Sequence, residues 1–181
     1  MTIRSLLPLG VWVLIAGLPI AIFAQTNSTN KDLKSADKSF ARAAAQGGMA
    51  EVQMGKLAAD KATTPALKAF AQRMVDDHSK ANRQLTVIDR QIGITPPEGI
   101  SAKEQAVYDS LSRLSGPAFD RAYTKVMVSD HQEDVKEFRK EASSGHNPEL
   151  KEFASQTLPT LRSHLDTIRA LESKPATEGT K

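Results

Sequence analysis

Apolar side chains recur every three or four residues in four long segments of the chain, at residues 38–62, 65–92, 117–143 and 148–171. This spacing is typical of an α-helix that buries one face. No stretch of useful length alternates apolar and polar residues as a half-buried β-strand does. The pattern therefore predicts an all-α fold with four long helices.

Helix-start signals stand at the edges of these segments. Asp37 and Thr64 are the predicted N-caps of the first and second long helices, and Asn147 is the predicted N-cap of the last. Ser101 and Glu104 have the spacing of a capping box, in which each residue satisfies a backbone N–H of the other. This box predicts a fifth, short helix between the second and third long ones.

The connections between the helices predict their arrangement. The first two and the last two long helices are joined by short connections, so each pair is expected to form an antiparallel hairpin. The connection between the pairs, residues 93–116, is long and holds the short helix, so it can run back along a bundle. We therefore expect a ferritin-like four-helix bundle with a long crossover, containing a short helix, between long helices two and three.

The start of the chain has the features of a secretory signal peptide. Arg4 gives a positive start, an apolar run follows, and Ala24 precedes a polar segment. We expect cleavage after Ala24; the alternative is an uncleaved anchor, because the apolar run is long enough to span a bilayer. The expected organisation is a signal peptide, a flexible linker, a four-helix bundle domain and a disordered tail, at residues 1–24, 25–36, 37–172 and 173–181.

Composition narrows the functional classes. The chain has no cysteine, which excludes disulfides, iron–sulfur clusters, thiol nucleophiles and a lipid-attachment cysteine. Its formal net charge is +3 with acidic and basic residues interspersed, so no clustered basic face suggests nucleic-acid binding. No second apolar span follows the signal peptide. We therefore expect an exported, periplasmic protein, with outer-membrane association left open; no feature identifies a protein partner.

Each long helix carries one polar, metal-competent residue on its apolar stripe, near the middle of the helix: Glu51, His78, His131 and His164. In a bundle of antiparallel hairpins the helix midpoints share a level, so these side chains are expected to converge in one layer of the core. Three imidazoles and one carboxylate suit Cu²⁺, Zn²⁺, Fe²⁺ or Mn²⁺. The sequence therefore predicts a transition-metal site formed by these four residues.

A structural role for the same layer is the alternative. Buried histidines can be satisfied by hydrogen bonds to neighbouring helices, and a Glu–His pair can fix helix register without a metal. Met54, Met74 and Met127 each lie one turn from a proposed ligand, and the topology puts all three on the same side of the layer. Thioethers favour Cu(I), but methionines at such positions more often fill gaps in a helical core.

Four further residues lie near the proposed ligands in the sequence. Asp77 and Asp130 immediately precede His78 and His131, and each can orient an imidazole or remain a solvated charge. Asp134, one turn after His131, is a lower-ranked ligand candidate. The fourth, the remaining histidine in the turn before the last helix, is expected at the surface. No nucleophile motif, phosphate loop or dinucleotide fingerprint occurs. Redox or hydrolytic catalysis at the metal ranks last among the functions considered, because four protein ligands leave no open position.

Several motifs resemble an exported bacterial family, the domain-of-unknown-function family 4142, whose members are often labelled predicted outer membrane proteins. The motifs are the run from Phe40 to Glu51, the run from Phe70 to His78, and the Asp-His pair at His131. The resemblance covers residues 38–172 and implies a ferritin-like fold and an envelope location. It implies no established activity.

The chain departs from the di-iron ferritins in the spacing of its ligands. Those proteins carry Glu-x-x-His on two helices. Here the residues three positions before His78, His131 and His164 are apolar, namely Val75, Val128 and Leu161. We therefore expect no carboxylate-bridged di-iron centre. The leading hypothesis is metal handling or sensing in the envelope, and the alternative is an envelope interaction or structural protein whose polar layer fixes helix register.

Overall fold

The computed structural model describes residues 33–173, which form five helices and no strand. The helices are α1 (Ser35–Lys61), α2 (Pro65–Gln91), α3 (Ala102–Ser112), α4 (Gly116–Ser144) and α5 (Pro148–Glu172). The all-α prediction is confirmed. The predicted signal peptide, most of the predicted linker and the tail from residue 174 lie outside the described residues.

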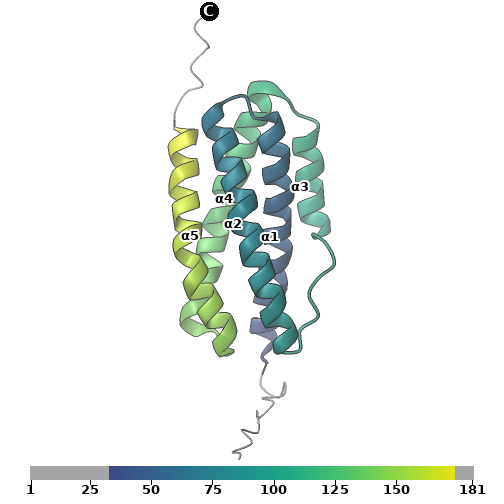
Figure 1. The fold of residues 1–181 in the computed structure, drawn as a ribbon, viewed down its shortest axis with the longest axis vertical. Coiled ribbons are helices and arrows are strands. Elements are labelled where there is room, and N and C mark those ends of the chain that lie inside the picture. Colours follow the sequence, from purple (N-terminus) through teal and green to yellow (C-terminus); the bar gives the residue numbers. More distant parts are fainter. Residues whose placement is uncertain (1–32, 174–181) are drawn as a thin grey trace, which may run out of the picture.

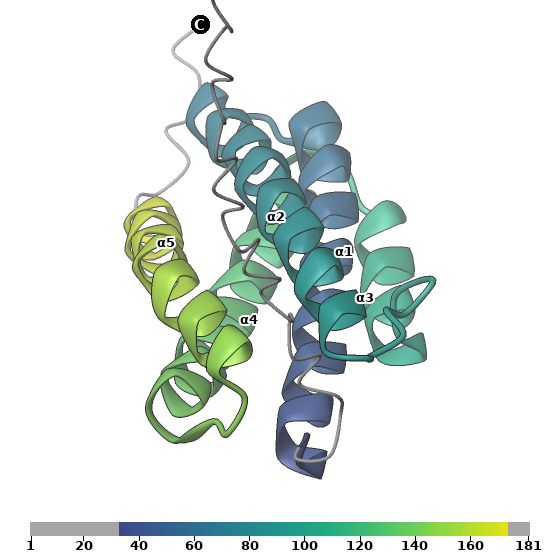
Figure 2. The ribbon, with the colours of Figure 1, turned by 60° about the horizontal axis from the view of Figure 1, so that its bottom comes forward.

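The four long helices lie side by side along one axis (Figure 1). Helix α1 packs against α2 and α4, and α5 packs against the same two helices. Helices α2 and α4 run in one direction, and α1 and α5 run in the other (Figure 1). The short helix α3 lies on the outside of the bundle against α1 and α4 (Figure 2). The connection from α2 to α4 therefore returns along the bundle and holds a short helix, as the sequence predicts.

Local side-chain hydrogen bonds begin three of the helices. The Thr64 hydroxyl accepts from the backbone N–H of Leu67, at 3.2 Å, to begin α2. Asn147 begins α5 in the same way. Both bonds of the capping box formed by Ser101 and Glu104 are present at α3. These predictions are confirmed, because each cap and its partner lie within three residues of each other.

The predicted capping role of Asp37 is wrong. Helix α1 begins at Ser35, and its N-cap position, Lys34, makes no side-chain cap hydrogen bond. Asp37 lies inside the first turn and is completely buried. Its carboxylate accepts hydrogen bonds from the backbone N–H groups of His146 and Asn147, both at 3.1 Å. Asp37 therefore ties the start of α1 to the turn between α4 and α5.

The core consists of two apolar clusters with a polar layer between them. One cluster contains Met54, Met74 and Met127 together with aromatic side chains of α2 and α4. The other is built around Leu85 and Phe138 with apolar residues of α5. The three methionines lie on one side of the layer, as predicted, and are at most 2% exposed, which fits the gap-filling role. None of the helices in residues 33–173 has the length and apolar character needed to cross a membrane.

Candidate metal centre

Four helices each contribute one side chain to the polar layer. Glu51 comes from α1, His78 from α2, His131 from α4 and His164 from α5, and each is buried, with at most 6% of its surface exposed. The rings of the three histidines have centroids 5.3 to 5.7 Å apart. The geometry therefore brings all four side chains into one cluster.

Glu51 contacts two of the histidines. Its Oε2 lies 2.8 Å from Nδ1 of His78, and its Oε1 lies 3.4 Å from Nδ1 of His131. Burial alone would raise the pKa of Glu51, but the interactions with His78 and His131 outweigh it and lower the pKa to about 2. Burial also disfavours the charged form of His78, but Glu51 outweighs it and raises the pKa of that ring. Glu51 is therefore ionised at neutral pH.

Each histidine ring has one nitrogen held by a hydrogen-bond acceptor. Nδ1 of His131 lies 3.0 Å from the backbone carbonyl oxygen of Met127, Nε2 of His164 lies 2.8 Å from Oδ2 of Asp77, and Nδ1 of His78 faces Glu51. A carbonyl or an ionised carboxylate can only accept, so each of these nitrogens carries a hydrogen. In a neutral ring the other nitrogen then presents a lone pair.

The remaining nitrogens of His131 and His164 face each other, and the ring of His78 lies beside both. One ring nitrogen from each of His78, His131 and His164 lies within 4.8 Å of the other two. Nε2 of His131 is 3.3 Å from Nδ1 of His164, and Nε2 of His78 has no hydrogen-bond partner in the part of the chain that the structure describes. Burial lowers the pKa of His131, and it lowers the pKa of His164 to about 4, so both rings are neutral at pH 7. Two lone pairs therefore meet with no hydrogen between them.

Asp77 orients a ring, but not the ring of its sequence neighbour. Its carboxylate accepts from His164, a residue 87 positions away, and also pairs with Arg73 at 3.3 Å. Burial raises the pKa of Asp77, but the hydrogen bond from His164 and the pair with Arg73 outweigh it and lower the pKa. The orienting role considered from the sequence is therefore present, on a different imidazole. His146, in contrast, is exposed at the surface, as predicted.

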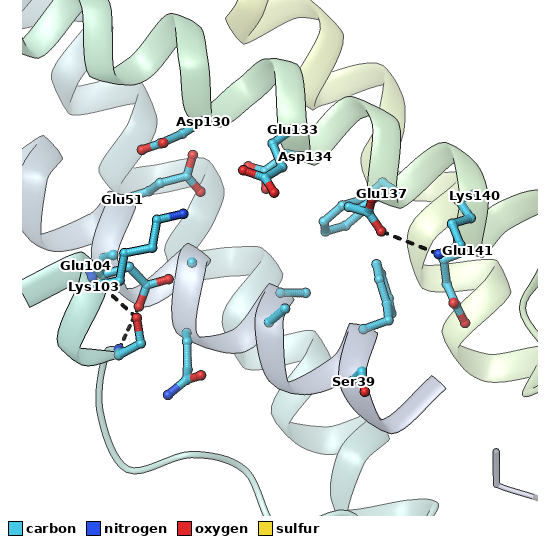
Figure 3. A pocket seen from close by; sticks show the side chains of 18 of the residues that line it. Ser39, Glu51, Lys103, Glu104, Asp130, Glu133, Asp134, Glu137, Lys140 and Glu141 are labelled. Carbon is cyan, nitrogen blue, oxygen red and sulfur yellow. Dashed lines mark hydrogen bonds and ion pairs between the residues drawn. The ribbon is translucent and has the colours of Figure 1, made fainter. Parts of the chain in front are cut away.

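A second group of carboxylates adjoins the layer in a groove of about 540 Å³ between α1 and α4. Ligand atoms of Glu51, His131 and Asp134 lie within 4.8 Å of one another. Figure 3 shows Asp130 and Asp134 beside Glu51 in this groove. Burial, with the negative charge of Glu51 adding to it, raises the pKa of Asp134 well above its usual range and that of Asp130 to about 7.

The sequence reasoning missed this groove. It rests on an acidic stripe along α4, formed by Asp130, Glu133, Asp134, Glu137 and Glu141. The signal was present, because these positions recur every three or four residues and so share one helix face. It was overlooked because acidic stripes on a helix are usually solvated.

The chain belongs to the family described as "Domain of unknown function (DUF4142)", whose sequence model matches residues 23–171. No curated protein matches the sequence. Among solved structures, a DUF305 fragment from Deinococcus radiodurans has a TM-score of 0.68 at 18% identity, and the match covers 77% of this chain and 97% of that one.

Two other similar structures are of one protein, CopM. CopM in the Cu(II)-bound form has a TM-score of 0.64 at 18% identity, covering 75% of this chain and 95% of its own. CopM in the Cu(I)-bound form has the same TM-score and identity, covering 75% and 94%. At this level of identity the likeness shows a shared helical fold.

Proposed function

We propose that this protein of the DUF4142 family binds one transition-metal ion in its core, through ring nitrogens of His78, His131 and His164. Neutral imidazole nitrogens are the ligands that Zn²⁺, Cu²⁺ and related ions take in proteins. The observation that carries the proposal is the 3.3 Å approach of Nε2 of His131 to Nδ1 of His164, in rings whose other nitrogens donate to acceptors. A cation between these nitrogens replaces a repulsive contact by two bonds.

The acceptors around the rings fit the same role. Metal-bound histidines usually donate their other ring N–H to a carboxylate or a backbone carbonyl, which fixes the tautomer and strengthens the ligand. Asp77 and Met127 supply such acceptors to His164 and His131. The sequence predicts Glu51 as a fourth ligand. Because its Oε2 is bonded to Nδ1 of His78 and its Oε1 lies 3.4 Å from Nδ1 of His131, we propose that Glu51 orients His78 and balances the charge of the metal.

Copper is the first metal to test. Structures of similar fold bind Cu(I) and Cu(II), and a cluster of three buried methionines adjoins the histidines. Zn²⁺, Fe²⁺ and Mn²⁺ remain the other candidates. The rings are almost completely buried, so a substrate has no direct access, and metal handling fits better than catalysis. Because the sequence predicts a signal peptide, we propose that the protein acts in the bacterial envelope. We also propose that its bundle is ferritin-like, because α2 and α4 run in the same direction.

A structural layer without metal is the second candidate. The bond between His78 and Glu51 and the bond between His164 and Asp77 are both satisfied by the protein alone, at 2.8 Å each. Such bonds can fix the register of four helices. This role leaves Nε2 of His78 without a partner inside the core, which is costly for a buried polar atom.

Metal analysis of purified protein separates the two candidates. The chain is prepared without a histidine tag, and bound copper, zinc, iron and manganese are measured before and after titration with each ion. We expect close to one equivalent of a transition metal per chain. The His131→Gln variant is expected to lose at least about tenfold in affinity while keeping its helical circular dichroism. His146→Gln, which changes an exposed histidine outside the cluster, is the matched control and should bind like the parent.

Absence of stoichiometric metal from the parent, together with no uptake on titration, would reject the metal site and leave the structural layer. Equal loss of metal in the His131 and His146 variants would also reject it, because binding would then lie outside the core.

A further inference from the structure

The groove between α1 and α4 is lined by far more negative than positive side chains. Seven carboxyl groups and two lysines, Lys103 and Lys140, face it. Lys140 pairs with Glu137 at 3.9 Å. Within residues 33–173, Asp130 and Asp134 take part in no ion pair, and neither does Lys103. In the described part of the chain, Asp130 and Asp134 therefore have no lysine or arginine within ion-pair distance, although the charge of Lys103 is near enough to oppose the rise in the pKa of Asp130.

Glu51 connects this groove to the polar layer. Its Oε2 bonds to His78, whereas its Oε1 has no hydrogen-bond partner among the described residues. Nδ1 of His131 lies 3.4 Å from Oε1, but its hydrogen is directed to the carbonyl of Met127. Glu51 is 3% exposed. Its carboxylate points into the groove towards Asp130 and Asp134 (Figure 3). A buried charged oxygen beside two other carboxyl groups is expensive unless a proton shared with them or a cation reaches it.

We propose that Glu51, Asp130 and Asp134 form a second cation site, for a divalent ion that prefers oxygen ligands. Carboxylate oxygens are the ligands of Mg²⁺, Ca²⁺ and Mn²⁺. Asp134 and Glu51 offer oxygens within 4.8 Å of each other, close enough for one ion to contact both. The groove of about 540 Å³ leaves room for the waters that such ions retain.

The second site differs from the histidine cluster in chemistry and in access. The histidine cluster presents nitrogens inside the core, whereas the second site presents oxygens at the inner end of a groove. Nδ1 of His131, which borders the second site, donates to Met127 and is not available as a ligand. Glu51 bonds to His78 through Oε2, and its Oε1, 3.4 Å from Nδ1 of His131, makes no hydrogen bond to that ring, so the second site does not depend on a metal bound by the histidines.

Titration with Mn²⁺ tests the second site. The electron paramagnetic resonance signal of free Mn²⁺ falls as the ion binds, which gives affinity and stoichiometry directly. The full chain is compared with a variant that lacks the histidine cluster, His78→Ala/His164→Ala, and with Asp134→Asn. We expect the double variant to keep one Mn²⁺ site and Asp134→Asn to weaken it at least about tenfold.

Glu137→Gln is the matched control, because Glu137 lies on the same face of α4 but pairs with Lys140. It should change Mn²⁺ affinity by less than about twofold. Asp130→Asn repeats the test if Asp134→Asn fails to fold by circular dichroism.

Three outcomes would overturn the second site. The first is no Mn²⁺ bound by the parent at millimolar concentration, which means that the carboxyl groups share a proton instead. The second is equal affinity in the parent and both aspartate variants. The third is loss of Mn²⁺ in the histidine variant, which would move the ion to the histidine cluster. Because copper and zinc binding is measured separately, failure here leaves the proposed function untouched.

Discussion

Two buried carboxyl groups in this protein have pKa values shifted in opposite directions. Glu51 has two histidines beside it and stays ionised, with a pKa of about 2. Asp89 is also buried, but neither of its carboxylate oxygens has a hydrogen-bond partner among residues 33–173. Burial raises its pKa to about 6. It also lies in the last turn of α2, where the negative end of the helix dipole disfavours a further negative charge.

Replacing Asp89 should therefore stabilise the protein in a pH-dependent way. The folded chain holds the Asp89 proton more tightly than the unfolded chain, so ionisation lowers the free energy of unfolding as pH rises from about 4 through about 6. The Asp89→Asn variant avoids this loss. Relative to the parent, we expect it to gain on the order of 2 kcal/mol in free energy of unfolding between pH 4 and pH 8, measured by urea denaturation.

Asp166→Asn is the control for this prediction. Asp166 is exposed on α5, and a surface substitution of this kind changes stability by no more than about 0.5 kcal/mol. Parallel stability curves for the parent and Asp89→Asn between pH 4 and pH 8 would show that the charged form of Asp89 is not disfavoured in the fold.

The residues of the candidate site could be predicted from sequence, but not their hydrogen bonds. Helical periodicity alone puts Glu51 and the three histidines on inward faces, because it depends only on spacing. Which ring nitrogen faces which neighbour depends on the rotation of each helix and on side-chain torsions. The contact of Asp77 with His164 spans 87 positions, so no local pattern could reveal it.

At the scale of helices, contacts between residues close in sequence could be predicted, and contacts between residues far apart in sequence could not. The caps at Thr64, Asn147 and Ser101 use partners three residues away, and the sequence identifies them. Asp37 looked like another cap, but its donors come from a turn more than 100 residues later. An acidic residue near the start of a helix interacts favourably with the helix dipole whether it caps that helix or binds a distant turn. The sequence alone therefore could not distinguish these two roles of Asp37.

Helices α1 and α2 approach closely at Gly55. A Cβ atom built on Gly55 would lie 3.1 Å from the backbone carbonyl oxygen of Ala71 and 3.0 Å from a methyl group of Val75. Alanine improves helix propensity by about 1 kcal/mol over glycine. Here that gain is outweighed, because a backbone oxygen cannot move without separating the helices. We expect Gly55→Ala to lower the free energy of unfolding by about 1–3 kcal/mol in urea denaturation.

Gly47, two turns earlier on α1, provides the matched control. A Cβ atom there would have one contact, at 3.9 Å from a carboxylate oxygen of Glu104. Gly47→Ala should therefore raise the free energy of unfolding by about 0.5–1 kcal/mol, through helix propensity alone. If both variants gain stability, the spacing of α1 and α2 does not depend on Gly55.

At the scale of the whole molecule, the crossover sets the composition of each layer of the core. Helices α2 and α4 run in the same direction (Figure 1). Met74 and Met127, which precede His78 and His131 by four residues, therefore lie on the same side of the polar layer and share one core cluster. The length of the connection was enough to predict this. The length of the connection could not predict that α3 packs against α1 and α4, because a connection this long can reach several faces of the bundle. In this position α3 borders the acidic groove.

A layer that takes one side chain from each long helix links metal binding to the stability of the whole fold. The unfolded chain cannot hold the three imidazoles together, so a metal stabilises the folded state by RT ln(1 + [metal]/Kd), about 2.7 kcal/mol at one hundred times Kd. For a domain of this size that corresponds to a rise in Tm of roughly 5–10 °C, measured by calorimetry with added Zn²⁺ or Cu²⁺. The His146→Gln control should show the same rise, and His131→Gln, with affinity weakened at least about tenfold, should show about half of it or less. An equal rise in both variants would mean that the metal binds the folded chain away from the layer, and that the four helices are held in register by hydrogen bonds alone.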